Sequence, residues 1–206
     1  NAYGIQDTEE ANKWLCECIN SMPSHVAMDS ETTGLYPRDG HILGISLSYE
    51  EDRGVYIDTE CFDERTEALL QTLANQTTIV FHNAKFDMAF FEYHFNLTFP
   101  KFEDTMLLHY LIDENPGTHG LKQLAMKYTV YGDYEKPQYD WMAQYRKDHG
   151  ILKNDFTWDL IPFDIMKTYA AMDAVVTLLV FKKFVKIKQN KRLEKVYNNI
   201  LIPGCR

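Results

Sequence analysis

The sequence has few cysteines and no long hydrophobic run. Only four of its 206 residues are cysteine, at Cys16, Cys18, Cys61 and Cys205. Cys16 and Cys18 lie two apart on an expected helix and point to different faces, so we expect free thiols rather than a disulfide framework. No apolar run approaches the roughly 18 residues that cross a membrane, and the first ten residues are too polar for a signal peptide. Secreted and membrane-spanning classes are therefore not indicated.

Basic residues are also in short supply. The chain has 21 Lys and Arg against 30 Asp and Glu, for a formal charge of −9. This balance argues against a broad electrostatic nucleic-acid surface, but it is compatible with an enzyme that holds cations and grips a nucleic acid locally. Hydrophobic residues make up 45% and charged residues 25% of the chain, which indicates a globular domain rather than a disordered, collagen-like or coiled-coil chain.

The hydrophobic pattern changes along the chain. Short alternating or buried runs predict strands over 25–30, 41–49, 54–58, 77–82 and 99–102, with the first three strands forming an antiparallel meander. Helical spacing predicts helices over 8–19, 63–75, 84–95, 105–112, 120–128 and 162–188. Residues 129–160 are expected to be irregular. The order of elements predicts an α/β domain with a mixed five-stranded sheet flanked by helices.

Two carboxylates stand together on the first predicted strand. Asp29 and Glu31 in M-D-S-E-T-T-G-L are two residues apart, so both side chains project to the same face. Neighbouring carboxylates repel each other, and a hard cation such as Mg²⁺ relieves that repulsion. The alternative is that the strand ends here and both groups simply face water.

Two more segments place polar groups four residues apart on a helix. Asn83 and Asp87 lie at a strand-to-helix junction in F-H-N-A-K-F-D, and Tyr169 and Asp173 lie on the last long helix in T-Y-A-A-M-D. A spacing of four puts each pair on one helical face. Taken alone, each is better explained by a helix cap or a surface pair. Together, the segments supply four carboxylates and a phenol, the ligand set for two cations in phosphodiester hydrolysis.

The same segments carry a family resemblance. D-S-E-T-T-G-L, H-N-A-K-F-D and Y-A-A-M-D resemble the three motifs of the DEDD 3′–5′ exonucleases. Tyr169 stands four residues before Asp173, as in the tyrosine subclass, whereas the histidine subclass has His at the position of Thr168. The segments F-E-D-T-M-L-L-H-Y-L-I-D, G-L-K-Q-L-A and R-L-E-K-V-Y-N-N-I-L-I-P resemble the proofreading exonuclease domain of family A (polymerase I-like) DNA polymerases from bacteria or phages.

The resemblance implies a fold, a reaction and an organisation. The fold would be ribonuclease-H-like, with residues 1–190 forming the exonuclease domain and 191–206 beginning a connection towards a polymerase domain. The implied reaction is hydrolysis of DNA from the 3′ end to nucleoside 5′-monophosphates with two divalent cations, Mg²⁺ or Mn²⁺. The implied partners are single-stranded or frayed 3′ DNA ends and a polymerase domain, in the cytoplasm of a bacterium or of a phage-infected host.

The resemblance also assigns roles to individual residues. Asp29 would bridge both cations, Glu31 and Asp173 would complete the tighter site, and Asp87 would hold the second cation through water. Tyr169 would orient the attacking water, because a phenol with a pKa near 10 stays neutral at pH 7. The implied substrate contacts are Thr32 near the terminal 3′-OH, Leu35 as a wedge between the last two bases, and His82. Asn83 would contact the substrate end or hold the Asp87 loop.

Two other functions remain open. A ribonuclease D-like 3′–5′ RNA exonuclease shares the tyrosine subclass, and nothing in the sequence excludes a 2′-OH. A non-catalytic module that binds 3′ ends or braces a polymerase is the alternative of another class. The aromatic residues between positions 131 and 158 either stack on single-stranded bases or pack a long excursion onto the core; they are Tyr131, Tyr134, Tyr139, Trp141, Tyr145 and Trp158.

Overall fold

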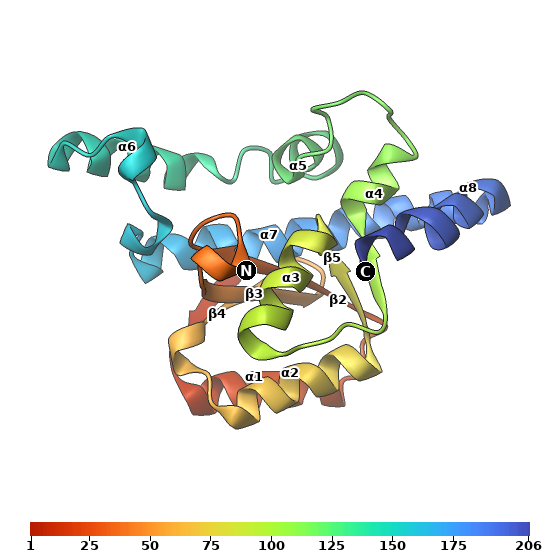
Figure 1. The fold of residues 1–206 in the computed structure, drawn as a ribbon, viewed down its shortest axis with the longest axis horizontal. Coiled ribbons are helices and arrows are strands. Elements are labelled where there is room, and N and C mark those ends of the chain that lie inside the picture. Colours follow the sequence, from red (N-terminus) through yellow and green to blue (C-terminus); the bar gives the residue numbers. More distant parts are fainter.

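A computed structural model describes the backbone of residues 1–206 and the side chains of all of them except 187 and 188. It contains one six-stranded sheet with helices on both faces (Figure 1). The strands are β1 (Ala2–Ile5), β2 (His25–Thr32), β3 (Ile42–Glu50), β4 (Arg53–Asp58), β5 (Thr78–Phe81) and β6 (Phe102–Asp104). The helices are α1 (Thr8–Asn20), α2 (Glu64–Gln76), α3 (Ala84–Phe95), α4 (Thr105–Tyr110), α5 (Leu121–Tyr128), α6 (Lys136–His149), α7 (Phe163–Phe184) and α8 (Lys191–Val196).

The sheet is mixed, with the order β1-β4-β3-β2-β5-β6. Strands β2, β3 and β4 form the expected antiparallel meander, whereas β5 and β6 run parallel to β2. The expected count of five strands is wrong, because β1 adds a sixth strand parallel to β4. Strand β1 has only four residues, one of them a glycine, so it carries too short an alternation to be recognised in the sequence.

The period-two pattern of β2 decides which residues face which helices. Val26 and Met28 belong to the core beneath α1, α2 and α3, and Ala27 belongs to the core beneath α7. Since side chains alternate along a strand, Asp29 and Glu31 project to the α7 face together with Ala27. In Figure 1, α7 crosses one face of the sheet while α1 and α2 cover the other.

Small residues line the contact between helix α7 and the sheet. Ala170, Ala171 and Ala174 are completely buried in α7. Gly54 on β4 faces it, and a Cβ built at Gly54 would lie 2.5 Å from the Ala171 carbonyl oxygen. This close approach brings the middle of α7, with Tyr169 and Asp173, over the carboxylates of β2.

Three other sequence expectations are corrected. The segment 129–160 is not irregular throughout, because α6 occupies Lys136–His149; only Gln138 in this helix is buried, so it shows no helical hydrophobic period. The last long helix ends at Phe184 rather than 188, and a 3₁₀ turn over Val185–Gln189 follows it. Strand β6 begins at Phe102, three residues later than expected.

The C-terminal residues pack against the sheet. Tyr197 is completely buried, accepts a hydrogen bond from the Asp104 N–H at 2.8 Å and donates one to Glu103 Oε2 at 2.7 Å. All four cysteines are free thiols, as expected. Among the described residues, no helix has both the length and the hydropathy to cross a membrane.

Candidate active site

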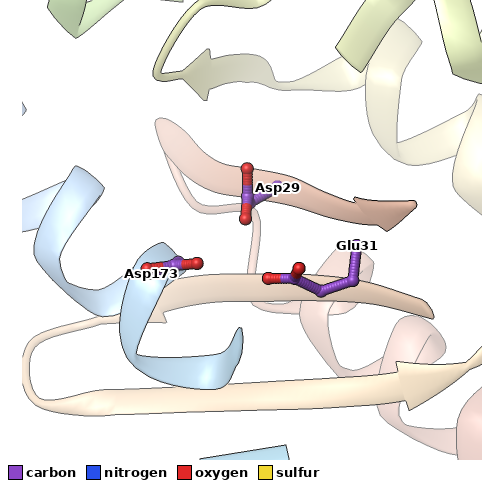
Figure 2. A group of neighbouring side chains, drawn as sticks. All are labelled: Asp29, Glu31 and Asp173. Atoms are coloured by element: carbon purple, nitrogen blue, oxygen red, sulfur yellow. The ribbon is translucent and has the colours of Figure 1, made fainter. Parts of the chain in front are cut away.

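Three of the four carboxylates singled out by the sequence come together. Asp29 and Glu31 project from β2, and Asp173 projects from α7 towards them (Figure 2). One carboxylate oxygen from each lies within 4.8 Å of the others. Glu31 and Asp173 are buried, and Asp29 is partly exposed, so the cluster is open to solvent on the Asp29 side.

The fourth carboxylate, Asp87, lies beside this group without being part of it. It sits in the first turn of α3 and is 2% exposed. Its Oδ1 accepts hydrogen bonds from the Ser30 backbone N–H at 3.1 Å and from the Ser30 hydroxyl. Ser30 lies between Asp29 and Glu31 on β2, so the bond ties α3 to the strand that carries the cluster.

All four carboxyl groups have raised pKa values. Burial raises the pKa of Asp29 from 3.8 to about 7, despite opposing hydrogen bonds from Asp173 and the Ser30 backbone. Burial and then the charge of Asp29 raise the pKa values of Glu31, Asp87 and Asp173. Carboxylates held this close are costly when ionised and unpaired, and clusters of such groups are typical of functional sites.

Two tyrosines adjoin the cluster. Tyr169 lies one helical turn before Asp173 on α7, and burial, followed by the charges of Asp173 and Glu31, raises its pKa. Its phenol is therefore neutral at pH 7. Tyr134, from the segment between α5 and α6, donates a hydrogen bond to Asp173 Oδ1. The two rings are 6.2 Å apart between centroids.

Comparison with known proteins decides the family. The family model described as 3′–5′ exonuclease matches residues 3–189. The chain belongs to this 3′–5′ exonuclease family. It is 48% identical over 210 residues to the DNA polymerase of Escherichia phage T5, covering 98% of this chain and 25% of the relative. It is 27% identical to DNA polymerase I of Borreliella burgdorferi, covering 87% of this chain and 19% of that protein.

Solved structures show the fold of this exonuclease family member. Escherichia coli RNase D, an exoribonuclease, superposes with a TM-score of 0.67 at 18% identity, covering 92% of this chain and 45% of that one. Brucella melitensis NrnC with bound Mg²⁺ superposes with a TM-score of 0.62 at 18% identity, covering 93% and 85%. The ribonuclease-H-like fold and the resemblance to polymerase I-like relatives are thus confirmed.

The donor set of this exonuclease cluster suits a divalent cation. All the candidate ligands are carboxylate oxygens, which hard cations such as Mg²⁺ and Mn²⁺ prefer. Within the described residues, Asp29, Glu31 and Asp173 form the group whose oxygens could hold one ion together. Their mutual repulsion is the cost that a bound cation would remove.

The expected substrate-contacting residues of the exonuclease occupy different places. Leu35 is 75% exposed and lines, with Asn83, a shallow groove of about 300 Å³ between the β2–β3 loop and α3. Thr32 lies at the end of β2, and its hydroxyl donates to the Gly34 carbonyl at 3.2 Å. His82 is turned inward: its Nδ1 lies 2.8 Å from the Thr105 hydroxyl.

Asn83 opens α3 in an unusual conformation. Its φ is +68°, and its side chain makes no capping bond. Asparagine tolerates this left-handed region better than most residues. Asp104 replaces the missing cap by accepting hydrogen bonds from the N–H groups of Asn83 at 3.1 Å and Ala84 at 2.8 Å. Asn83 is one of the residues that line the groove.

Sequence reasoning missed two contacts at the site. Ser30 bonds Asp87 across 57 positions and Tyr134 bonds Asp173 across 39. Tyr134 is one of the aromatic residues for which the sequence allowed either base stacking or packing onto the core. Its bond to a cluster carboxylate has no local signal in the sequence, because it depends on how the segment after α5 folds back over α7.

Proposed function

We propose that this 3′–5′ exonuclease acts on DNA, removing nucleoside 5′-monophosphates from 3′ ends, and serves as the proofreading module of a DNA polymerase. The carboxylate cluster of Asp29, Glu31 and Asp173 on the α7 face of the sheet is the observation that carries the chemistry. The 48% identity to the phage T5 DNA polymerase supports the polymerase context. The chain spans about a quarter of that relative's length.

Asp29, Glu31 and Asp173 would hold one divalent cation, and Asp29 with Asp87 would hold a second. The support for Asp87 is its place beside Ser30, next to the cluster but outside the trio. Such cations, Mg²⁺ or Mn²⁺, supply a water nucleophile at neutral pH and stabilisation of the departing 3′ oxygen. The Mg²⁺ in the structurally similar Brucella melitensis NrnC supports this cofactor.

The remaining residues position the reacting groups. Tyr169 would donate a hydrogen bond that orients the attacking water, as a neutral phenol rather than as a base. Leu35, exposed on the β2–β3 loop, would insert between the last two bases, and Asn83 would contact the strand end from the same groove. Thr32 would lie near the terminal 3′-OH. The inward orientation of His82 gives its proposed substrate contact no support.

The substrate should enter as a single strand. The carboxylates are largely buried between β2 and α7, so a terminal phosphodiester must leave a duplex to reach them. We therefore propose single-stranded or frayed 3′ ends as the substrate. We also propose that residues 1–190 form the nuclease domain, that 191–206 lead towards a polymerase domain, and that the protein works in the cytoplasm of a bacterial or phage-infected cell.

The second candidate is a 3′–5′ exoribonuclease. The structural match to Escherichia coli RNase D favours it, but at 18% identity that match concerns the fold. The higher identity to the phage polymerase favours DNA. The non-catalytic alternative has less support, because all four carboxylates and Tyr169 are present.

A single gel experiment separates the three functions. The chain is incubated with a 5′-labelled single-stranded DNA, the same sequence as RNA, and a blunt duplex, each with Mg²⁺, Mn²⁺ or EDTA. We expect a descending ladder from single-stranded DNA that EDTA abolishes, and slower loss of the duplex. Equal or faster loss of RNA would favour the ribonuclease. No cleavage with either cation would favour the binding module.

A further inference from the structure

The segment between α5 and α6 contributes a side chain to the acidic cluster. In Figure 1 this segment runs along α7 on the side away from the sheet. From it, Tyr134 donates its phenolic hydrogen to Oδ1 of Asp173. Asp173 is only 5% exposed, so this donor replaces water that the carboxylate would otherwise bind. The contact is the one direct link between the segment and the carboxylates among the described hydrogen bonds.

Other contacts hold the segment in place independently of the cluster. Tyr131 donates a hydrogen bond to Asp52 in the β3–β4 turn. Asp133 forms a salt bridge of 3.3 Å with Lys122 on α5. Tyr134 follows Asp133 directly in the chain, and it packs against the core cluster that contains the buried residues of α7. These contacts hold the segment in addition to the bond between Tyr134 and Asp173.

The hydrogen bond at Oδ1 of Asp173 also affects the second oxygen of this carboxylate. The phenolic hydrogen of Tyr134 occupies Oδ1 of Asp173. The bond also fixes the rotation of the carboxyl group and leaves its second oxygen free. Outer hydrogen bonds of this kind orient metal ligands, and their loss costs about 10- to 100-fold in metal affinity or activity.

We propose that Tyr134 is a positioning residue that holds Asp173 in the orientation needed to bind a divalent cation. The inference rests on the proposed function, because it assumes that the cluster binds such a cation. It makes the α5–α6 excursion part of the active site.

The test is cation binding by two matched variants. Tyr134→Phe removes the hydroxyl at Asp173 and keeps the ring, whereas Tyr131→Phe removes the equivalent hydroxyl of the same segment at Asp52. Binding of Mn²⁺ alone, without DNA, is measured by calorimetry and by the electron paramagnetic resonance signal of free Mn²⁺. Thermal unfolding in EDTA verifies that each variant is folded.

We expect Tyr134→Phe to weaken Mn²⁺ binding by about 10-fold or more, with Tyr131→Phe within about twofold of wild type. Cleavage of single-stranded DNA by Tyr134→Phe should recover towards wild type at high Mn²⁺, with KM for DNA unchanged. Equal Mn²⁺ affinity in Tyr134→Phe and wild type, or equal weakening by both variants, would overturn the role of Tyr134. Absence of Mn²⁺ binding by the wild-type protein would overturn the proposed cation site as well.

Discussion

Replacing Asp29 by asparagine should stabilise the cation-free protein while it removes activity. One carboxylate oxygen from each of Asp29, Glu31 and Asp173 lies within 4.8 Å of the others. Two unit charges at that distance repel by about 3 kcal/mol at an effective dielectric constant of 20. Burial separately raises the pKa of Asp29 from 3.8 to about 7, which corresponds to a cost of about 4 kcal/mol for its ionised form.

The sign of the effect follows from proton binding. Between pH 3.8 and 7 the folded protein keeps a proton on Asp29 that the unfolded chain releases, so stability falls as pH rises through this window. Above pH 7 the full penalty is present. The asparagine side chain of the variant carries no charge at any pH, so the variant escapes this penalty.

The assay is unfolding in EDTA at several pH values. At pH 8 we expect Asp29→Asn to be more stable than wild type by about 2 to 4 kcal/mol, or roughly 5 to 10 °C in Tm. The gain should shrink towards pH 5 and disappear near pH 4. Added Mg²⁺ should stabilise wild type more than the variant. Asp164→Asn on the exposed start of α7 serves as the control.

Two results would refute this reasoning. If Asp29→Asn were no more stable than wild type in EDTA at pH 8, neither burial nor the neighbouring carboxylates would penalise the ionised form of Asp29. If the gain were independent of pH, it would come from something other than the charge of Asp29.

Three further outcomes are expected. Gly54→Ala places a methyl group 2.5 Å from the Ala171 carbonyl oxygen. It should lower the free energy of unfolding by about 1–3 kcal/mol and reduce cleavage by displacing α7. Gly204→Ala, where nothing lies within 4 Å, is the control, and equal denaturation midpoints of the two variants would contradict the packing. Burial lowers the pKa of His82 from 6.5 to about 4. The free energy of unfolding of wild type should therefore fall by about 2 kcal/mol more than that of His82→Asn between pH 7 and pH 5. Urea unfolding at both pH values measures this difference, and equal losses in the two proteins would argue against it. Tyr197→Phe leaves the Asp104 N–H without its partner and should cost about 1–3 kcal/mol in denaturant unfolding, whereas an unchanged midpoint would show that the bond contributes nothing.

Local patterns in the sequence predicted much of the fold. The alternation in β2 predicted that Asp29 and Glu31 share a face, and the spacing of four predicted that Tyr169 and Asp173 share a face of α7. Both predictions depend only on backbone periodicity. The expectation that these two faces lie together rested on the combination of motifs and on the family resemblance. The structure brings the three carboxylates together.

The elements that sequence reasoning missed have weak local signals. Strand β1 is four residues long and pairs with β4, about 50 positions away, so nothing near it in the sequence indicates its partner. Helix α6 has one buried residue, Gln138, and therefore no hydrophobic period. The bonds of Ser30 and Tyr134 to the carboxylates join residues 57 and 39 positions apart, and only the folded chain brings them together.

The central claim is that the cluster between β2 and α7 cleaves DNA from its 3′ end. The most direct measurement compares Asp173→Asn with Asp164→Asn, two neutralising changes on the same helix, one in the cluster and one exposed. Each variant and the wild-type protein are incubated with a 5′-labelled single-stranded DNA and Mg²⁺, and the products are followed over time. We expect a descending ladder from wild type and Asp164→Asn, and intact DNA with Asp173→Asn. A ladder of wild-type rate from Asp173→Asn would contradict it.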